Sequence, residues 1–195
     1  MIPAALLACA LNIHPVTLEA VIRVESHGDP LALNVNRLAG PQPRPATVAE
    51  AVQMAESYIA RGYSVDLGLM QVNSRNLAAL GYSIEQVLDP CTSIRAGASI
   101  LTANYAEAAR RFGDGQDALK AALSAYNTGN FRRGFANGYV ARYYGPGGVP
   151  ALPGGVRQAM LTVAATKRTA PAAPLDPYTA DSQVYVREAT NVVVQ

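Results

Sequence analysis

The chain has 195 residues, of which 50% are hydrophobic and 15% are charged, and its formal net charge is +2. This length suffices for one domain with a substantial core plus an appendage, and the composition is typical of a globular protein. Since the charge balance provides no strongly basic face, nothing in it indicates a nucleic-acid partner.

The apolar start of the chain, MIPAALLACA, lacks a basic leader and is shorter than an ordinary signal or membrane-spanning segment. No later run is long enough to span a bilayer, so we expect neither a clear signal peptide nor a membrane span. The two cysteines, Cys9 and Cys91, match no metal-binding spacing, and we expect no metal site. A pair so far apart in sequence is compatible with a long-loop disulfide and equally with two buried thiols.

The first strong helix signal begins at Pro15, a residue suited to a first helical turn, and extends to about Ser26, before glycine and proline end it. Glu25 is the next position on the apolar stripe of this helix. The stripe itself consists of Leu18, Val21 and Ile22.

The segment 34–44 is rich in Gly, Pro and Asn and is predicted to be a loop. Its first half is compatible with a short hairpin, so we expect a small β element between Asn34 and Pro41. A second helix follows, with Thr47 and Glu50 as its capping box and a glycine as its stop. Its predicted apolar stripe consists of Val48, Ala51, Val52, Ala55 and Ile59.

The stretch YSVDLGLMQVN, residues 63–73, alternates poorly and is predicted to be an extended turn. A short helix from Ser74 to Leu80 and a capped turn at Ser83 and Gln86 come next. Two longer amphipathic helices are predicted, one from about Thr92 to Phe112 and one over DALKAALSAYN.

The last helical candidate is Gly138–Tyr144, after which the composition shifts to GPGGVPALPGG and TAPAAPLDP. These segments sustain neither the helical nor the strand period. The sequence therefore predicts one domain over residues 1–145. Residues 146–195 are predicted to be a Pro/Gly/Ala-rich tail, largely extended or disordered, with one helical turn near Val156–Ala165.

Glu25 is the first candidate for chemistry. A carboxyl at the end of an apolar stripe has its pKa raised by desolvation and by the negative end of the helix dipole. Such a group can stay protonated near neutral pH, as a general acid for glycosidic bond cleavage requires. Helical phase alone favours the simpler alternative, a glutamate that reaches solvent at a helix end.

Three stretches in order, VES (24–26), GLMQVN (68–73) and AYNTG (125–129), resemble the signature of the lysozyme-like lytic transglycosylases, the SLT family. These enzymes cut the glycan strands of bacterial peptidoglycan, and the resemblance covers roughly residues 5–145. VESHGDPLALNVN and AYNTGNFRRGFANGYV in particular are similar to the VirB1-type transglycosylases of type IV secretion and conjugation systems. The resemblance implies a mainly α, lysozyme-like α+β fold with about seven helices around a substrate groove.

The resemblance also implies roles for residues near Glu25, which itself would act as catalytic acid and then as base. Ser26 would hold the substrate or orient the acid, while a hydroxyl that bonds back to the helix end is an open alternative. Gly68 would let the backbone approach a ligand closely, and Met70 would form an apolar wall for sugar faces. Gln71 would offer donors and acceptors to hydroxyl or acetamido groups.

Two residues of AYNTG are implied to line the groove near the catalytic acid. These are Tyr126 and Asn127, although the helical pattern alone assigns Tyr126 to the core and Asn127 to a helix end. Tyr139 resembles the later family tyrosine whose hydroxyl bonds the catalytic glutamate. Tyr143 and Tyr144 are close rivals, and Tyr143 stands where the family usually has an apolar residue.

The family chemistry needs one carboxylate and no metal or organic cofactor. The implied reaction cleaves the MurNAc–GlcNAc β-1,4 bond and leaves a 1,6-anhydroMurNAc end. Asp66 is the one acidic candidate for a second carboxylate, which would indicate a hydrolytic, lysozyme-type muramidase. A turn aspartate or a salt-bridge partner is the simpler interpretation of Asp66.

The biological setting also follows from the resemblance. The implied partners are the peptidoglycan glycan strand and, through the tail, components of a secretion or conjugation apparatus, in the periplasm or cell envelope. A disulfide between Cys9 and Cys91 is implied, since DPC stands where relatives place a paired cysteine. The alternative from another class is a peptidoglycan-docking or assembly factor that kept the fold.

Overall fold

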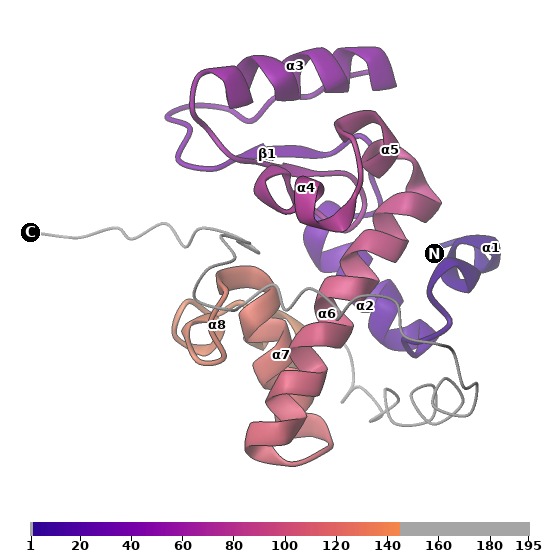
Figure 1. Ribbon diagram of the computed structural model, residues 1–195, viewed down its shortest axis with the longest axis vertical. Coiled ribbons are helices and arrows are strands. Elements are labelled where there is room, and N and C mark those ends of the chain that lie inside the picture. Colours follow the sequence, from indigo (N-terminus) through magenta and orange to yellow (C-terminus); the bar gives the residue numbers. More distant parts are fainter. Residues whose placement is uncertain (1, 145–195) are drawn as a thin grey trace, which may run out of the picture.

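The long helix α6 runs through the middle of the protein in the computed structural model, which describes residues 2–144 (Figure 1). The predicted tail and its helical turn near Val156–Ala165 lie outside the described residues. The helical segments are α1 (Ala4–Leu7), η1 (Ala8–Ala10), α2 (Pro15–Ser26), α3 (Val48–Ala60), η2 (Ser74–Asn76), α4 (Leu77–Leu80), α5 (Ile84–Leu88), α6 (Pro90–Phe112), α7 (Gln116–Thr128), α8 (Arg133–Ala136) and α9 (Ala141–Tyr144). The strands are β1 (Leu33–Val35), β2 (Val65–Leu67) and β3 (Val72–Asn73).

These elements give the mainly α fold with a small β element that the sequence predicts. Helices α6 and α7 pack along each other, and α8 lies beside α7 in the lower half of Figure 1. The sheet, α3, α4 and α5 form the upper half of the same view. Among the described residues no single helix is long and apolar enough to cross a membrane, although the bent pair Ala4–Ala10 and Pro15–Ser26 together has the length and composition for it.

Helix α2 has the predicted bounds and buries the predicted stripe. Pro15 occupies its first turn, where the missing N–H costs no hydrogen bond, and the side chain of His14 accepts a hydrogen bond from the backbone N–H of Val16. The helix ends at Ser26, and the next residue, His27, adopts a left-handed conformation with φ +57°. The stripe residues Leu18, Val21 and Ile22 are fully buried.

The N-terminal segment is fixed to the rest of the domain by a covalent bond. A disulfide joins Cys9, in η1, to Cys91, in the first turn of α6, with 5.5 Å between the two Cα atoms. The two cysteines are 82 positions apart in sequence. The bond therefore closes a loop that contains α2, the whole sheet and α3.

The β element is larger than predicted, and of its three strands only β1 overlaps the predicted range of residues 34–41. The sheet is antiparallel with strand order β1-β2-β3, and Asp66 in its middle strand faces Asn34 on one side and Asn73 on the other. The small β element expected between Asn34 and Pro41 is present only in its first residues, which belong to β1. A hairpin within the loop does not form, because the partner of β1 comes from the stretch expected to be an extended turn.

Two physical features account for this difference. β2 has only three residues, which is too short for a strand period to be recognised, and all three are buried, including the polar Asp66. In addition, the side chain of Gln42 covers the outer edge of β1. Its Oε1 accepts from Val35 N at 2.6 Å and its Nε2 donates to Val35 O at 3.2 Å, which are the bonds a hairpin partner strand would make.

Helix α3 has Thr47 as its predicted cap residue, but one of the two hydrogen bonds of the capping box has a different donor. The hydroxyl of Thr47 accepts from Glu50 N at 3.2 Å, but the Glu50 carboxylate accepts from Ala46 N and not from the cap residue itself. Val48, expected in the apolar stripe, is 43% exposed, whereas Ala51 and Ala55 are buried. The stripe of this helix therefore begins one turn later than predicted.

The second half of the domain follows the predicted helices with small shifts. The capping box of Ser83 and Gln86 is complete, and α6 begins two residues early because Asp89 accepts from Thr92 N and caps it. The candidate helix Gly138–Tyr144 is reduced to α9, and α8 was missed.

Candidate active site

Glu25 stands in the last turn of α2 and meets Tyr139, which lies in the segment between α8 and α9. The hydroxyl of Tyr139 donates a hydrogen bond to Glu25 Oε1. Glu25 is half-buried, whereas Tyr139 is only 2% exposed. The arrangement leaves a carboxyl that is partly open to solvent and held from behind by a buried phenol.

Tyr139 itself is held by Tyr143 of α9. Their hydroxyl oxygens are 2.8 Å apart, and their rings make an edge-on contact with centroids 5.4 Å apart. Burial raises the pKa of the Tyr139 phenol well above its usual value, and the neighbouring Glu25 and Tyr143 raise it further. The phenol therefore keeps its proton, so it remains a hydrogen-bond donor to Glu25.

A chain of side-chain amides fixes the backbone beside Tyr139. Asn137 accepts from Tyr139 N with its Oδ1 at 3.0 Å and donates from its Nδ2 to Asn127 Oδ1 at 3.1 Å. Asn127, at the end of α7, is thus linked through Asn137 to the backbone of Tyr139. Sequence reasoning missed Asn137, although its place before Gly138 is typical of a turn.

The GLMQ stretch forms a tight turn between β2 and β3, in which Gly68 has φ +68°. A Cβ atom at Gly68 would lie 2.9 Å from the carbonyl oxygen of Val87 and 3.1 Å from Ser93 Oγ. The predicted reason for this glycine, close approach of a ligand, therefore needs correction. The space that the missing side chain leaves is filled by the protein's own α5 and α6.

Gln71 closes the same turn with a positive φ of +49°. Its Nε2 donates to Ala32 O and to Gly68 O, each at 3.0 Å. The prediction that Gln71 offers both donors and acceptors to a sugar is thus corrected, because both amide hydrogens are already used. What this side chain can offer a ligand is its carbonyl oxygen, Oε1.

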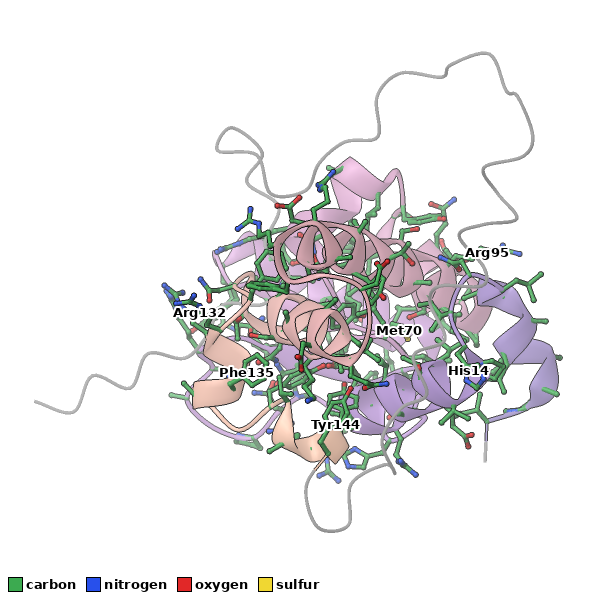
Figure 2. All side chains as sticks on the ribbon, turned by 90° about the horizontal axis from the view of Figure 1, so that it is seen from below. His14, Met70, Arg95, Arg132, Phe135 and Tyr144 are labelled. Carbon is green, nitrogen blue, oxygen red and sulfur yellow. A yellow bond between two sulfur atoms is a disulfide. The ribbon has the colours of Figure 1, made fainter. Side chains whose placement is uncertain are left out.

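Met70 is a core residue and not an apolar wall for a ligand. Its side chain is 0% exposed, and its atoms occupy the space where a Cβ on Gly97 of α6 would be, 2.5 Å from Met70 Cβ. Figure 2 shows Met70 inside the protein among the helices, whereas Arg132 and Phe135 lie at the periphery. The backbone of Met70 is held by Tyr126, whose hydroxyl donates to Met70 O at 2.7 Å.

The hydroxyl groups of Ser26 and Tyr126 both bind backbone groups of the protein. Ser26 is buried, and its Oγ donates to Ile22 O at 3.1 Å and accepts from Gly28 N at 3.2 Å. This is the alternative in which the hydroxyl bonds back to the helix end. Tyr126 is buried, as its place on the apolar stripe of α7 indicates, and it anchors the turn that contains Gln71.

Asp66 is fully buried in the middle strand of the sheet. Its Oδ1 accepts from Asn73 Nδ2 at 2.7 Å and its Oδ2 accepts from Asn34 Nδ2 at 3.0 Å. Both carboxylate oxygens are therefore engaged by neighbouring strands, and the side chain has no exposed surface for a substrate. Its role in the structure is to join the three strands of the sheet.

Among residues 2–144 no group of three or more histidine, cysteine, aspartate or glutamate side chains could hold a metal ion. The chemistry that the described site can offer is proton transfer at one carboxyl. A general acid needs such a carboxyl, together with a surrounding that fixes its orientation. Glu25 and the phenol of Tyr139 supply both.

Comparison with known proteins identifies the family to which the chain belongs. Residues 4–143 match the family described as Transglycosylase SLT domain, so the protein is a member of this family with its lysozyme-like fold. No solved structure matches the chain.

The similar curated proteins are more specific. The chain is 42% identical over 134 residues to Protein virB1 of Agrobacterium fabrum, across 69% of this chain and 54% of the relative. It is 39% identical over 140 residues to Type IV secretion system protein virB1 of Brucella abortus, across 69% of this chain and 58% of that protein. The chain thus spans little more than half the length of these relatives.

Proposed function

We propose that the protein is a peptidoglycan lytic transglycosylase that cleaves the β-1,4 bond between N-acetylmuramic acid and N-acetylglucosamine. The observation that carries the proposal is the half-buried carboxyl of Glu25, held by the protonated phenol of Tyr139. Membership of the SLT family and the likeness to proteins named virB1 support it.

In the proposed reaction Glu25 first gives its proton to the glycosidic oxygen as the bond from C1 of the muramyl sugar breaks. The acetamido group of that sugar stabilises the positive charge that develops at C1. The Glu25 carboxylate then removes the proton of the C6 hydroxyl, whose oxygen bonds to C1. The product is a 1,6-anhydro end, Glu25 is again protonated, and no water is consumed.

Tyr139 serves the second half of this cycle, in which Glu25 is ionised. A phenol that donates to a carboxylate makes a stronger hydrogen bond than one that donates to a neutral acid. Tyr139 therefore stabilises the carboxylate that must accept the C6 proton. Asp66 does not act as a second carboxylate in this mechanism, because both of its oxygens are engaged within the sheet.

We further propose that this activity opens the cell wall locally for a type IV secretion or conjugation apparatus, in the periplasm or cell envelope. The names of the relatives support this setting. The disulfide between Cys9 and Cys91 supports it too, since disulfides persist in oxidising compartments such as the bacterial periplasm. The tail 146–195 is the candidate contact with the apparatus.

The test is Glu25→Gln, which removes the titratable proton and keeps the size of the side chain. We expect release of soluble fragments from purified peptidoglycan to fall by at least about 100-fold. Glu19→Gln is the matched control, since Glu19 is on the same helix and we expect wild-type activity from it.

The mass of the products tests the reaction type. An anhydro end is lighter than a reducing end by one water, so mass spectrometry separates transglycosylation from hydrolysis. Products with reducing ends only would replace the proposal with a lysozyme-type muramidase. If Glu25→Gln released soluble fragments from peptidoglycan as fast as the wild type, Glu25 would not be the catalytic acid. If Glu25→Gln were inactive on peptidoglycan but still supported secretion fully, an assembly role would be favoured.

A further inference from the structure

We propose that Tyr143 is a positioning residue whose hydroxyl acts on Glu25 through Tyr139. The three oxygens form a continuous series, in which Tyr139 donates to Glu25 Oε1 and the hydroxyls of Tyr139 and Tyr143 are 2.8 Å apart. The inference rests on the proposed role of Glu25 and extends it to a residue outside the motifs that indicated the site.

The direction of the hydrogen bonds in this series depends on the charge of Glu25. A phenol has one proton, so Tyr139 cannot donate to Glu25 and to Tyr143 at the same time. When Glu25 is ionised, Tyr139 donates to the carboxylate and its oxygen is free to accept the proton of Tyr143. When Glu25 is protonated, the series can reverse, with Tyr139 as the donor to Tyr143.

The two hydrogen-bond arrangements of Glu25, Tyr139 and Tyr143 differ in strength. The series that ends on a carboxylate is charge-assisted, and each bond in it polarises the next. The Tyr143 hydroxyl therefore stabilises the ionised form of Glu25 more than the protonated form. In the proposed cycle it makes the proton easier to release to the glycosidic oxygen, and it stabilises the carboxylate that accepts the C6 proton.

The packing around the two tyrosines makes this coupling effective. Both phenols are almost completely buried, so water does not compete for their hydroxyls. The titratable or charged groups that the structure brings to Tyr139 are Glu25 from α2 and Tyr143 and Arg142 from α9. The Arg142 guanidinium carbon lies 5.8 Å from the centre of the Tyr139 ring.

The test compares Tyr143→Phe with Tyr144→Phe, two variants that each remove one phenol oxygen from the same short helix. The Tyr144 hydroxyl donates to Gln116 Oε1 at 3.1 Å and belongs to a different contact, with α7. The primary measurement is the titration of the Glu25 side-chain carboxyl by carbon-13 NMR, which needs no activity. The second is the pH dependence of peptidoglycan cleavage.

We expect Tyr143→Phe to move the Glu25 titration to higher pH by about half a pH unit, and to move the alkaline limb of the activity profile in the same direction. Tyr144→Phe is expected to move neither. Incorporation of 3-fluorotyrosine at position 143 makes this phenol a stronger donor with almost no change of shape, so it should move the Glu25 titration to lower pH.

The two changes at position 143 are expected to shift the Glu25 titration in opposite directions. A loss of packing would not produce the reversed shift on fluorination, so the pair of variants separates a positioning role from a packing role. An unchanged titration in both 143 variants, or equal shifts in the 143 and 144 phenylalanine variants, would overturn the inference. If Tyr143→Phe does not fold, the Glu25 titration of the fluorinated protein alone tests the inference. A wild-type protein that cleaves no peptidoglycan would refute the proposed function, whereas the NMR titration would still decide the coupling to Tyr143.

Discussion

Glu25 and Tyr139 are 114 residues apart in sequence, and their meeting depends on a few polar side chains. Asn137 uses both ends of its amide, one to hold the backbone of Tyr139 and the other to hold Asn127. The phenol thus reaches Glu25 from a loop that is fixed to α7. The role proposed for Tyr139 requires such a fixed loop, because proton transfer tolerates little misplacement.

The sequence could predict the place of Glu25 at the end of a buried helix stripe, but it could not predict the contacts of its neighbours. A stripe at helical spacing shows which face of a helix is buried, and Glu25 occupies the last position on it. Met70 and Gln71 lie in a turn, where no period indicates which groups face inward. Only the folded chain shows that Met70 packs on Gly97 and that the Gln71 amide hydrogens are used by backbone carbonyls.

Gly68 leads to a prediction at the residue scale. Gly68→Ala should be destabilised by its positive φ of +68° and by the 2.9 Å approach of the new Cβ to Val87 O. Gly81→Ala is the control, because Gly81 has φ +73° and a Cβ atom added there would meet nothing within 4 Å. We expect Gly81→Ala to lower the free energy of unfolding by about 1–2 kcal/mol. Gly68→Ala should cost about 1–3 kcal/mol more, as measured by urea denaturation, and equal losses would contradict the packing argument.

At the scale of elements, the long helices were predicted well because each has a repeated apolar face, and α2, α3 and α6 also have a side-chain cap. The strands were not, because strands of two or three residues are too short to show a period. The short helix α8 depends on contacts made at a distance, since Ser124 Oγ of α7 accepts from Gly134 N at 2.8 Å. Local sequence carries no information about such a bond.

Asp89 provides a prediction at this scale, as the cap of α6. The backbone N–H and the hydroxyl of Thr92 both donate to its carboxylate at 2.8 Å and hold the pKa of Asp89 below its usual value of 3.8. We expect Asp89→Ala to lower the free energy of unfolding by about 1 kcal/mol at neutral pH. Asp89→Asn should lose less, since asparagine is an equally good cap residue.

The pH dependence follows from the sign of that shift. A carboxyl with a lowered pKa in the folded state contributes stability that is complete above its unfolded pKa and is lost as the pH falls through the folded value. The stability difference between wild type and Asp89→Ala should therefore be constant from neutral pH to about 5 and narrow below about 3.8. Denaturation curves collected between pH 2 and pH 7 check this, and a difference that grew on acidification would contradict the assignment of the cap.

At the scale of the whole molecule, the N-terminal segment is the part that the sequence defined least. It is apolar but too short for a helical period, and its two turns, α1 and η1, were not predicted. Besides apolar packing against the core, a hydrogen bond and a covalent bond attach this segment to the rest. Asn12 Nδ2 donates to Thr102 Oγ1 at 2.8 Å, and the disulfide joins Cys9 to Cys91 at the start of the central helix α6.

The disulfide gives a prediction for the stability of the whole domain. Because it closes a loop between residues 82 positions apart, it removes much conformational freedom from the unfolded chain. Replacing Cys9 and Cys91 together by serine should lower the free energy of unfolding by about 2–5 kcal/mol. Thermal unfolding with and without a reductant provides the control, since the reductant should destabilise the wild type and leave the double variant unchanged. The hydrogen bond between Tyr139 and Glu25 involves neither cysteine, so we expect the folded double variant to keep cleaving peptidoglycan. Equal stability of the oxidised wild type and the double variant would show that the bond does not constrain the fold.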